Sequence, residues 1–181
     1  MSQSSIRHES PAGVDRVIRE HPVVARSERL AAEFGEINAE LIAIVSGCKE
    51  EEWQSPSVDE GWPIGVVAHH VAIVIPAFIR IVQQIAAGAI LTIRVSMEEV
   101  HEGNARHALE CADVRPAEVL ELLKTHGGEC RHVLSDLSDE QLAITTAAFP
   151  GRELSLAEVV ERIVIGHSRQ HLASLRATLA G

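Results

Sequence analysis

The stretch SLAEVVERIVIGHSRQHLASL, residues 155–175, decides the fold class of this 181-residue chain. Ser155 and Glu158 have the spacing of a capping box, in which each side chain bonds the other residue's backbone N–H at a helix start. Beyond them, apolar residues recur at three- and four-residue steps, the period of one face of an α-helix. The sequence therefore predicts a helix from Ser155 to about Leu179, whose inward stripe comprises Leu156, Val159, Val160, Ile163, Val164, His167, His171, Leu172 and Leu175.

The same period predicts three further long helices upstream. Inside the second of these, Pro76 removes the amide that would bond the carbonyl of Ala72, so we expect a kink there. No stretch shows a convincing strand alternation; the closest are ELIAIV and AILTIRV, and the first lies within a helical stripe. The predicted long helices span residues 23–46, 63–88 and 116–137, and a shorter helix spans residues 96–111.

Composition favours an all-α fold in one domain. Hydrophobic residues make up 46% of the chain, but aromatic residues make up only 3% and tyrosine is absent. A core built from Ala, Val, Ile and Leu favours packed helices over a β-sandwich, which relies on aromatic and β-branched strand positions. We therefore expect a four-helix bundle over residues 22–181, with a short extra helix between helices two and three, and a flexible polar segment over residues 1–21.

Charge, targeting signals and cysteine content indicate which partners the protein can have and in which compartment it works. With 16 basic and 26 acidic residues, the chain has a net charge of −10 and repels phosphate backbones, so we expect no nucleic-acid partner. The N-terminal MSQSSIRHES lacks the apolar core of a signal peptide. The apolar stretch Gly65–Ile93 is interrupted too often to span a membrane, so we expect no membrane partner. The scattered, odd set of cysteines indicates reduced thiols in a cytoplasmic protein: Cys48, Cys111 and Cys130.

The segment HSRQH places His167 and His171 four residues apart on the predicted last helix. That spacing puts both side chains on one helix face, with Cβ atoms about 5–6 Å apart. Two imidazoles there can share one ion at about 2.0–2.1 Å. Because the pair continues the apolar stripe, we expect it to point into the bundle, where a metal ion would offset the cost of burying both rings. The alternative is a pair of surface or hydrogen-bonded histidines.

A second pair, His69 and His70, lies in the middle of the apolar second helix. Adjacent residues differ by about 100° around a helix, so only one of the two can face His167 and His171. The other is expected to hydrogen-bond a neighbour, to contact substrate or to lie at a subunit interface. Three histidine ligands would leave a fourth position for water or substrate, as in catalytic zinc sites.

Other polar residues are weaker candidates for the site. His101, Asn104 and His107 recur at three-residue steps on the short middle helix and could line the open side of the metal and contact substrate, although a solvated helix face is the simpler interpretation. A ligand imidazole usually donates its free N–H to an acceptor. Glu161 could supply one, whereas Arg169 could not, because a guanidinium group has no acceptor.

A family resemblance rests on these same residues. Trp62 followed by PIGVVAHHVA resembles the W-x7-H-[LIV]-A segment of the DinB-like superfamily, a group of metal-binding four-helix bundles that includes the YfiT-like proteins and the N-terminal domain of mycothiol-dependent maleylpyruvate isomerase. The middle segment EEVHEGNARHA is also similar, and the resemblance extends from about residue 24 to residue 180. It implies that the metal ligands are His70, His167 and His171, with His69 as the alternative first ligand.

The resemblance also implies a metal-dependent enzyme acting on a small molecule, in which a metal-bound thiolate of a low-molecular-weight thiol attacks an electrophile during transfer or isomerisation. Hydrolysis by metal-bound water is the close alternative. A different class is a non-catalytic metal-binding protein, or a binding or stress-response protein that dimerises through its apolar segment Val66–Ile79. We expect the protein to form a homodimer. Zinc is the default ion for three imidazoles, with nickel and iron as alternatives, and neither Cys111 nor Cys130 is needed as a ligand.

Overall fold

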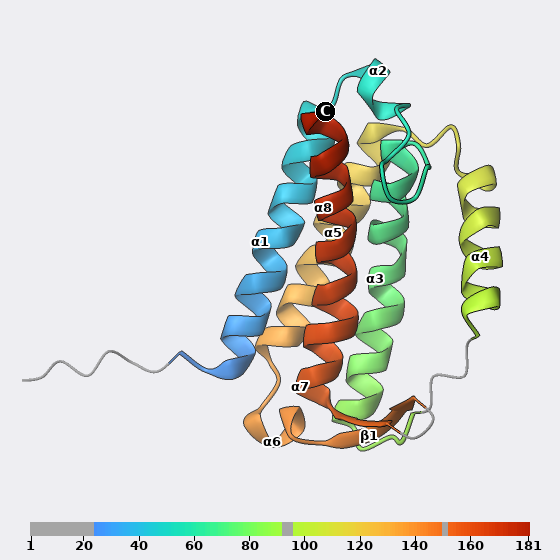
Figure 1. The fold of residues 1–181 in the computed structure, drawn as a ribbon. Coiled ribbons are helices and arrows are strands. Elements are labelled where there is room, and N and C mark those ends of the chain that lie inside the picture. The colour runs from blue at the N-terminus through green and yellow to red at the C-terminus, as the bar shows by residue number, and fades with distance from the viewer. Residues whose placement is uncertain (1–23, 92–95, 150–151) are drawn as a thin grey trace, which may run out of the picture.

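The computed structural model describes residues 24–91, 96–149 and 152–181. The expected flexible segment, residues 1–21, lies outside the described part of the chain. Within that part, four long helices lie side by side and form the predicted bundle (Figure 1). They are α1 (Arg26–Gly47), α3 (Ile64–Ala86), α5 (Pro116–Ser135) and α8 (Gly166–Ala180), and the last is preceded by α7 (Leu156–Val159) and a π-helical turn (Val160–Ile165).

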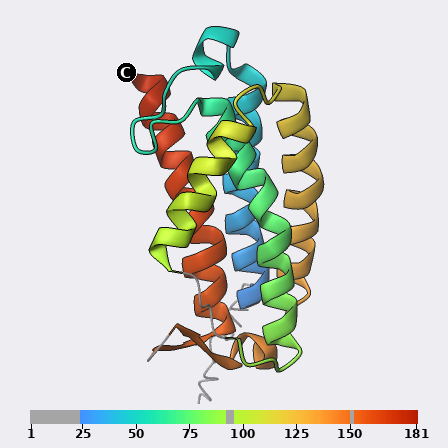
Figure 2. The same cartoon turned by 90° about the vertical axis from the view of Figure 1, so that its right-hand side faces the viewer.

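The helices are not arranged in simple up-and-down order around the bundle. α1 and α3 each pack against α5 and α8, and so they occupy opposite corners. Because α3 and α5 run in the same direction, the chain has to return between them, and α4 (Met97–Glu110) makes that return outside the bundle (Figure 1). α4 is the extra helix predicted from the sequence, and it crosses obliquely over the face that α3 and α8 form (Figure 2).

α3 is the central helix of the core, and every residue from Ile64 to Ala72 is buried. It is the one described helix that is long and apolar enough to cross a membrane, but 61% of its most apolar window is buried inside the structure, as expected of a core helix. The helix continues through Pro76. Nδ1 of His126 on α5 donates a hydrogen bond to the carbonyl of Ala72 at 2.9 Å and so replaces the amide that proline lacks.

Short elements close the end of the bundle where α1 begins. These are α6 (Asp139–Leu142) and a two-stranded antiparallel sheet of β1 (Thr145–Phe149) and β2 (Arg152–Ser155), while α2 (Glu50–Trp53) lies at the other end. The sheet corrects the sequence analysis, which found no strand. Its β1 is TTAAF, which has no alternation of polar and apolar residues. It is held instead by the hydroxyl of Thr146, which bonds both the N–H and the carbonyl of Leu91.

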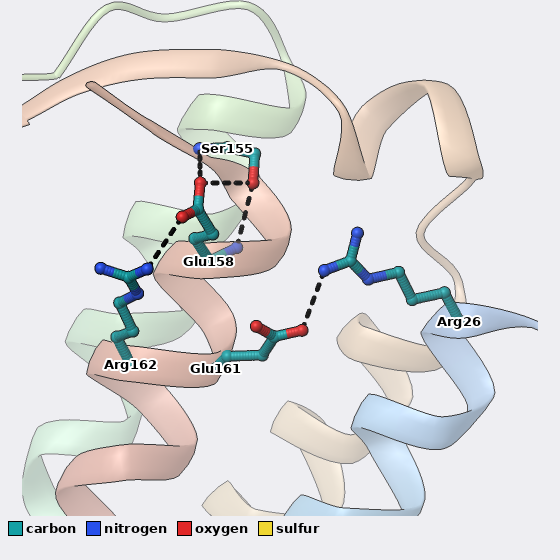
Figure 3. A network of polar contacts seen from close by, with 5 residues as sticks. All are labelled: Arg26, Ser155, Glu158, Glu161 and Arg162. Atoms are coloured by element: carbon teal, nitrogen blue, oxygen red, sulfur yellow. Dashed lines mark hydrogen bonds and ion pairs between the residues drawn. The ribbon is translucent and has the colours of Figure 1, made fainter.

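The start of the last helix forms as predicted (Figure 3). The hydroxyl of Ser155 accepts the N–H of Glu158, whose carboxylate accepts the N–H of Ser155 and a bond from Arg162. Glu161 forms an exposed ion pair with Arg26, which joins α1 to this helix. The π-helical turn, Val160–Ile165, contains Glu161 and buries Val160, Val164 and Ile165.

The burial of the two isoleucines in this turn departs from the predicted stripe. Ile165 is fully buried, whereas Ile163, which was predicted to lie on the inward stripe, is only partly buried. The N–H of Gly166 reaches back five residues to the carbonyl of Glu161, so the turn contains one residue more than an α-helix would. A simple 3.6-residue period therefore loses its phase just before the two histidines of α8.

Candidate metal centre

Three imidazoles from two helices meet inside the bundle. His70 comes from the buried part of α3, and His167 and His171 lie one turn apart on α8. Nε2 of His70 lies 3.2 Å from Nε2 of His167, and the ring centroids of His167 and His171 are 4.5 Å apart. One ring nitrogen from each residue falls within 4.8 Å of the other two. The structure therefore brings the three predicted ligands together; we call this group the histidine triad.

Burial keeps two of the triad imidazoles neutral. Burial, together with the neighbouring His171 and His107, lowers the pKa of His70 to about 4. Burial likewise lowers the pKa of His167 to about 3, together with His171 and His70. Near neutral pH both rings therefore have a free lone pair, which is the form that binds a metal ion.

Glu60 fixes the third imidazole. One carboxylate oxygen accepts a hydrogen bond from Nδ1 of His171 at 2.7 Å, and the other accepts hydroxyl bonds from Ser174 at 2.6 Å and Ser57 at 2.7 Å. Burial raises the pKa of Glu60, but these three hydrogen bonds outweigh it and hold the pKa below its ordinary value. Because the ionised carboxylate accepts the N–H of Nδ1, the lone pair of the neutral His171 ring lies on Nε2.

Backbone hydrogen bonds fix the conformation of the turn that carries Glu60. The N–H of Gly61 bonds the carbonyl of Ser57 at 2.9 Å, and Gly61 has a φ of 69°, a left-handed conformation that favours glycine. The hydroxyl of Thr178 accepts the N–H of Val58 at 3.0 Å, which ties the turn to α8. The Glu60 carboxylate is thus held against the helix that carries two triad residues.

Sequence reasoning missed Glu60 because the residue lies in an irregular loop, outside any helical period. The only signals were its carboxylate and the adjacent glycine. The acceptor proposed from the sequence, Glu161, pairs instead with Arg26, and Arg169 pairs with Glu33; both pairs are solvent-exposed. Neither residue bonds a triad imidazole in the described part of the chain, so this prediction was wrong.

The donor set of the triad fits a divalent transition ion. Two nitrogens at about 2.0–2.1 Å from a tetrahedral zinc ion lie about 3.3 Å apart, and Nε2 of His70 and Nε2 of His167 are separated by 3.2 Å. Depending on the tautomers, one of these nitrogens can donate a hydrogen bond to the other, or both can turn their lone pairs toward a shared cation. Three imidazoles leave the fourth tetrahedral position open.

Aromatic rings and α4 surround the triad. Phe78 meets His167 edge to face, with ring centroids 5.2 Å apart, and the Trp62 centroid lies 6.0 Å from that of His70. From α4, the ring of His107 lies 5.6 Å from His70.

The predicted substrate-contacting residues are spread around this region. Asn104 is partly buried, on the same side of α4 as His107, whereas His101 is exposed. No hydrogen bond or ring contact joins either residue to the triad in the described part of the chain, so their role in substrate binding stays a prediction. His69 points away from the triad and stacks on His107. It is therefore His70 that faces His167 and His171.

The comparisons with known proteins agree with this fold. The sequence profile of the DinB superfamily matches residues 33–175, which include every residue of the triad and Glu60. The chain belongs to the DinB superfamily. No curated protein gives a significant match to the sequence.

Two solved proteins of this superfamily's fold resemble the structure of the chain. YfiT from Bacillus subtilis, described as a probable metal-dependent hydrolase with an unusual four-helix bundle topology, is 18% identical, with a TM-score of 0.67 over 90% of this chain and 91% of YfiT. The mycothiol-dependent maleylpyruvate isomerase is 17% identical, with a TM-score of 0.63 over 82% of this chain and 60% of the isomerase. At these identities the likeness establishes the fold.

Proposed function

We propose that this DinB-superfamily protein is a divalent-metal-dependent enzyme that uses a low-molecular-weight thiol to transfer or isomerise a small electrophilic substrate. The observation that carries the proposal is the convergence of His70, His167 and His171 within 4.8 Å, with Glu60 bonded to His171. Zinc is the default ion, with nickel and iron as alternatives. When bound, the ion supplies positive charge that stabilises a thiolate, the reactive form of a thiol.

The surroundings of the triad favour a thiol over water as the nucleophile. Activation of water is helped by a carboxylate base, and the one carboxylate that bonds a triad residue in the described part of the chain is Glu60. Its two oxygens already accept three hydrogen bonds, which hold it in place as a positioning group. The chain's three cysteines are free, consistent with a reducing, cytoplasmic setting in which such thiols are abundant.

Hydrolysis is the second candidate, because YfiT is described as a probable metal-dependent hydrolase and matches this chain over nearly all of both proteins. A non-catalytic metal-binding protein or a dimeric binding protein is the alternative outside enzymes. A homodimer would bury the outer face of α3, where Ile73 is exposed by 39%.

The first experiment measures the metal content of tag-free protein and then its activity. We expect about one equivalent of a divalent ion per triad. His167→Ala should lose that equivalent, whereas His132→Ala, which changes an exposed histidine on α5, should keep it. The protein is then assayed with a panel of low-molecular-weight thiols and an electrophilic acceptor, and in parallel with ester and amide substrates.

Each outcome selects one function. Turnover that requires both the ion and a thiol supports the proposal. Turnover of esters or amides by the metal-loaded protein without any thiol would replace the proposal with hydrolysis. A folded protein that binds no ion at the triad would leave a non-catalytic binding protein as the function.

A further inference from the structure

A second cluster of ligating side chains lies beside the triad, where side chains of α3 and α4 meet. The ring of His69 on α3 stacks on that of His107 on α4, with centroids 5.1 Å apart and planes inclined by 9°. Cys111, which ends α4 one turn after His107, has its Sγ 3.5 Å from Nδ1 of His107. One ligand atom from each of the three residues lies within 4.8 Å of the other two.

One ring nitrogen in this cluster, Nδ1 of His69, is buried without a hydrogen-bond partner in the described part of the chain. His107 has a backbone hydrogen bond with Val66, and its Nδ1 faces Cys111. His69 is only 8% exposed, and it lines a cavity together with Cys111. Most buried polar groups in proteins have a partner, because leaving one unpaired costs free energy. Coordination to a cation would remove that cost and use the lone pair of an imidazole nitrogen.

The cavity has the charge that a cation needs. It measures about 250 Å³, and its walls include three carboxylate side chains in addition to the cysteine and the histidine: Glu110, Asp113 and Glu118. Acidic walls raise the local concentration of cations. A carboxylate oxygen or a water molecule from this cavity could supply a fourth ligand.

We propose that His69, His107 and Cys111 form a second metal site, which binds a divalent transition ion of the zinc class. Two imidazoles and a thiolate are ligands that such ions prefer, and the His-x3-Cys spacing on α4 brings two of them onto one helix face. Binding turns the stacked rings toward a common ion and releases the thiol proton of Cys111 to solvent. Because the ligands come from α3 and α4, the ion would hold α4 against the bundle next to the triad.

In the metal-free protein, Cys111 has to lose its thiol proton before it can bind an ion. Burial raises the pKa of its thiol, and the carboxylates of Glu110 and Glu118 raise it further. The metal-free side chain is therefore a neutral thiol near neutral pH, and a bound cation reverses the local electrostatics and deprotonates it. The histidine triad contains no sulfur, so a metal–sulfur signal distinguishes the two sites.

Cobalt(II) provides the test, because a cobalt–thiolate bond gives a charge-transfer band in the near ultraviolet and cobalt replaces zinc in such ligand sets. Metal-free full-length protein is titrated with cobalt(II), and the bound ion is then displaced with zinc. We expect two equivalents per chain and a sulfur band from one of them. Cys111→Ser should abolish the band and one equivalent, and His107→Ala should do the same.

Matched variants separate this site from the others. Cys48→Ser changes a cysteine that is partly buried like Cys111 but lies at the end of α1, and it should leave the band intact. His167→Ala should lose the equivalent bound at the triad and keep the band. Circular dichroism of Cys111→Ser checks that the helices are retained.

The proposal is overturned if the wild-type protein shows no sulfur band, or if folded Cys111→Ser retains it. One equivalent without a sulfur band, lost in His167→Ala, would remove the second site and leave the triad standing. A sulfur band that survives when His167→Ala abolishes the other equivalent would support the second site independently of the enzymatic proposal.

Discussion

Glu60 orients His171 from a position 111 residues earlier in the chain. A histidine bonded through Nδ1 to a carboxylate is fixed in one tautomer and one ring orientation, and its Nε2 becomes a stronger base. Loss of such a carboxylate typically costs a metal site about 10–100-fold in affinity. The residue thus acts on the candidate metal site through His171, without contacting the ion itself.

Glu60→Gln should therefore weaken metal binding at the triad by about 10–100-fold while the fold is retained. The amide keeps the size of the side chain, but it loses the charge and places two N–H donors among three groups that donate to Glu60. The affinity is measured by competition with a chromophoric chelator. Glu161→Gln is the control, because that carboxylate pairs with Arg26 at the surface, and its affinity should equal that of the wild type. Equal affinities in all three proteins would contradict the role of Glu60.

Single residues of the site differ in how far the sequence reveals them. His167 and His171 could be predicted to share a face because four-residue spacing on a helix fixes their relation, and His70 lies in a helix whose burial is evident from its composition. Which of His69 and His70 faces α8 depends on the rotation of α3, which is set by packing across the bundle. Glu60 depends on a loop conformation, for which the sequence offers no period.

At the level of elements, α3 combines a buried helix with an internal proline. Pro76 has no N–H for the carbonyl of Ala72, and a buried carbonyl without a donor is costly. His126 on α5 supplies that donor at 2.9 Å. The hydrogen bond also joins α3 to α5, the parallel pair of the bundle, close to the point where α3 carries His70.

His126→Ala should lower the free energy of unfolding by about 1–3 kcal/mol, because it leaves the Ala72 carbonyl without its donor. In a Pro76→Ala background the backbone amide is restored, so removing His126 there should cost less. Urea unfolding of the four proteins measures the coupling between the two positions. A cost for His126→Ala that is the same in both backgrounds would show that His126 stabilises the protein by some other contact.

Most helices could be predicted because their signals are local. Pro116 at the first turn of α5 and the Ser155–Glu158 capping box mark starts that need no tertiary information. The sheet and the π-helical turn could not be predicted, since β1 is held by contacts of Thr146 with Leu91 and the turn adds one residue to a helix. Both errors concern segments whose conformation is decided by their neighbours.

At the scale of the whole molecule, the crossover through α4 determines what surrounds the triad. Because α3 and α5 run parallel, α4 has to return along the outside of the bundle, and it lies over the face where α3 meets α8. That path brings His107 within 5.6 Å of His70, ring to ring, and within stacking distance of His69. The crossover through α4 thus places His107 both beside the triad and in the second cluster.

The same concentration of buried imidazoles should make the stability of the metal-free protein depend on pH. The folded pKa values of His70 and His167 are about 4 and about 3, below the ordinary value of 6.5, and burial also lowers the pKa of His69 and of His107. The unfolded chain therefore binds more protons than the folded chain below pH 6.5. By linkage, the neutral imidazoles contribute fully to the free energy of unfolding above that pH. This contribution is lost as the pH falls toward the pKa values of the folded protein.

Urea unfolding of the metal-free protein at a series of pH values should show this loss, roughly 1–2 kcal/mol for each pH unit just below 6.5. Glu60, whose pKa is held low by its hydrogen bonds, contributes in the same direction only at pH values below its ordinary 4.5. His167→Gln should flatten the dependence of stability on pH because one buried titrating group is gone, whereas His132→Gln, an exposed change, should leave the slope as it is.

A saturating divalent ion should raise stability near neutral pH, where it binds the folded chain, and its effect should vanish on acidification because protons compete for the same nitrogens. A metal-free protein equally stable on both sides of this window would mean that the rings of His70 and His167 are solvated, and the shared ion would then have no buried site.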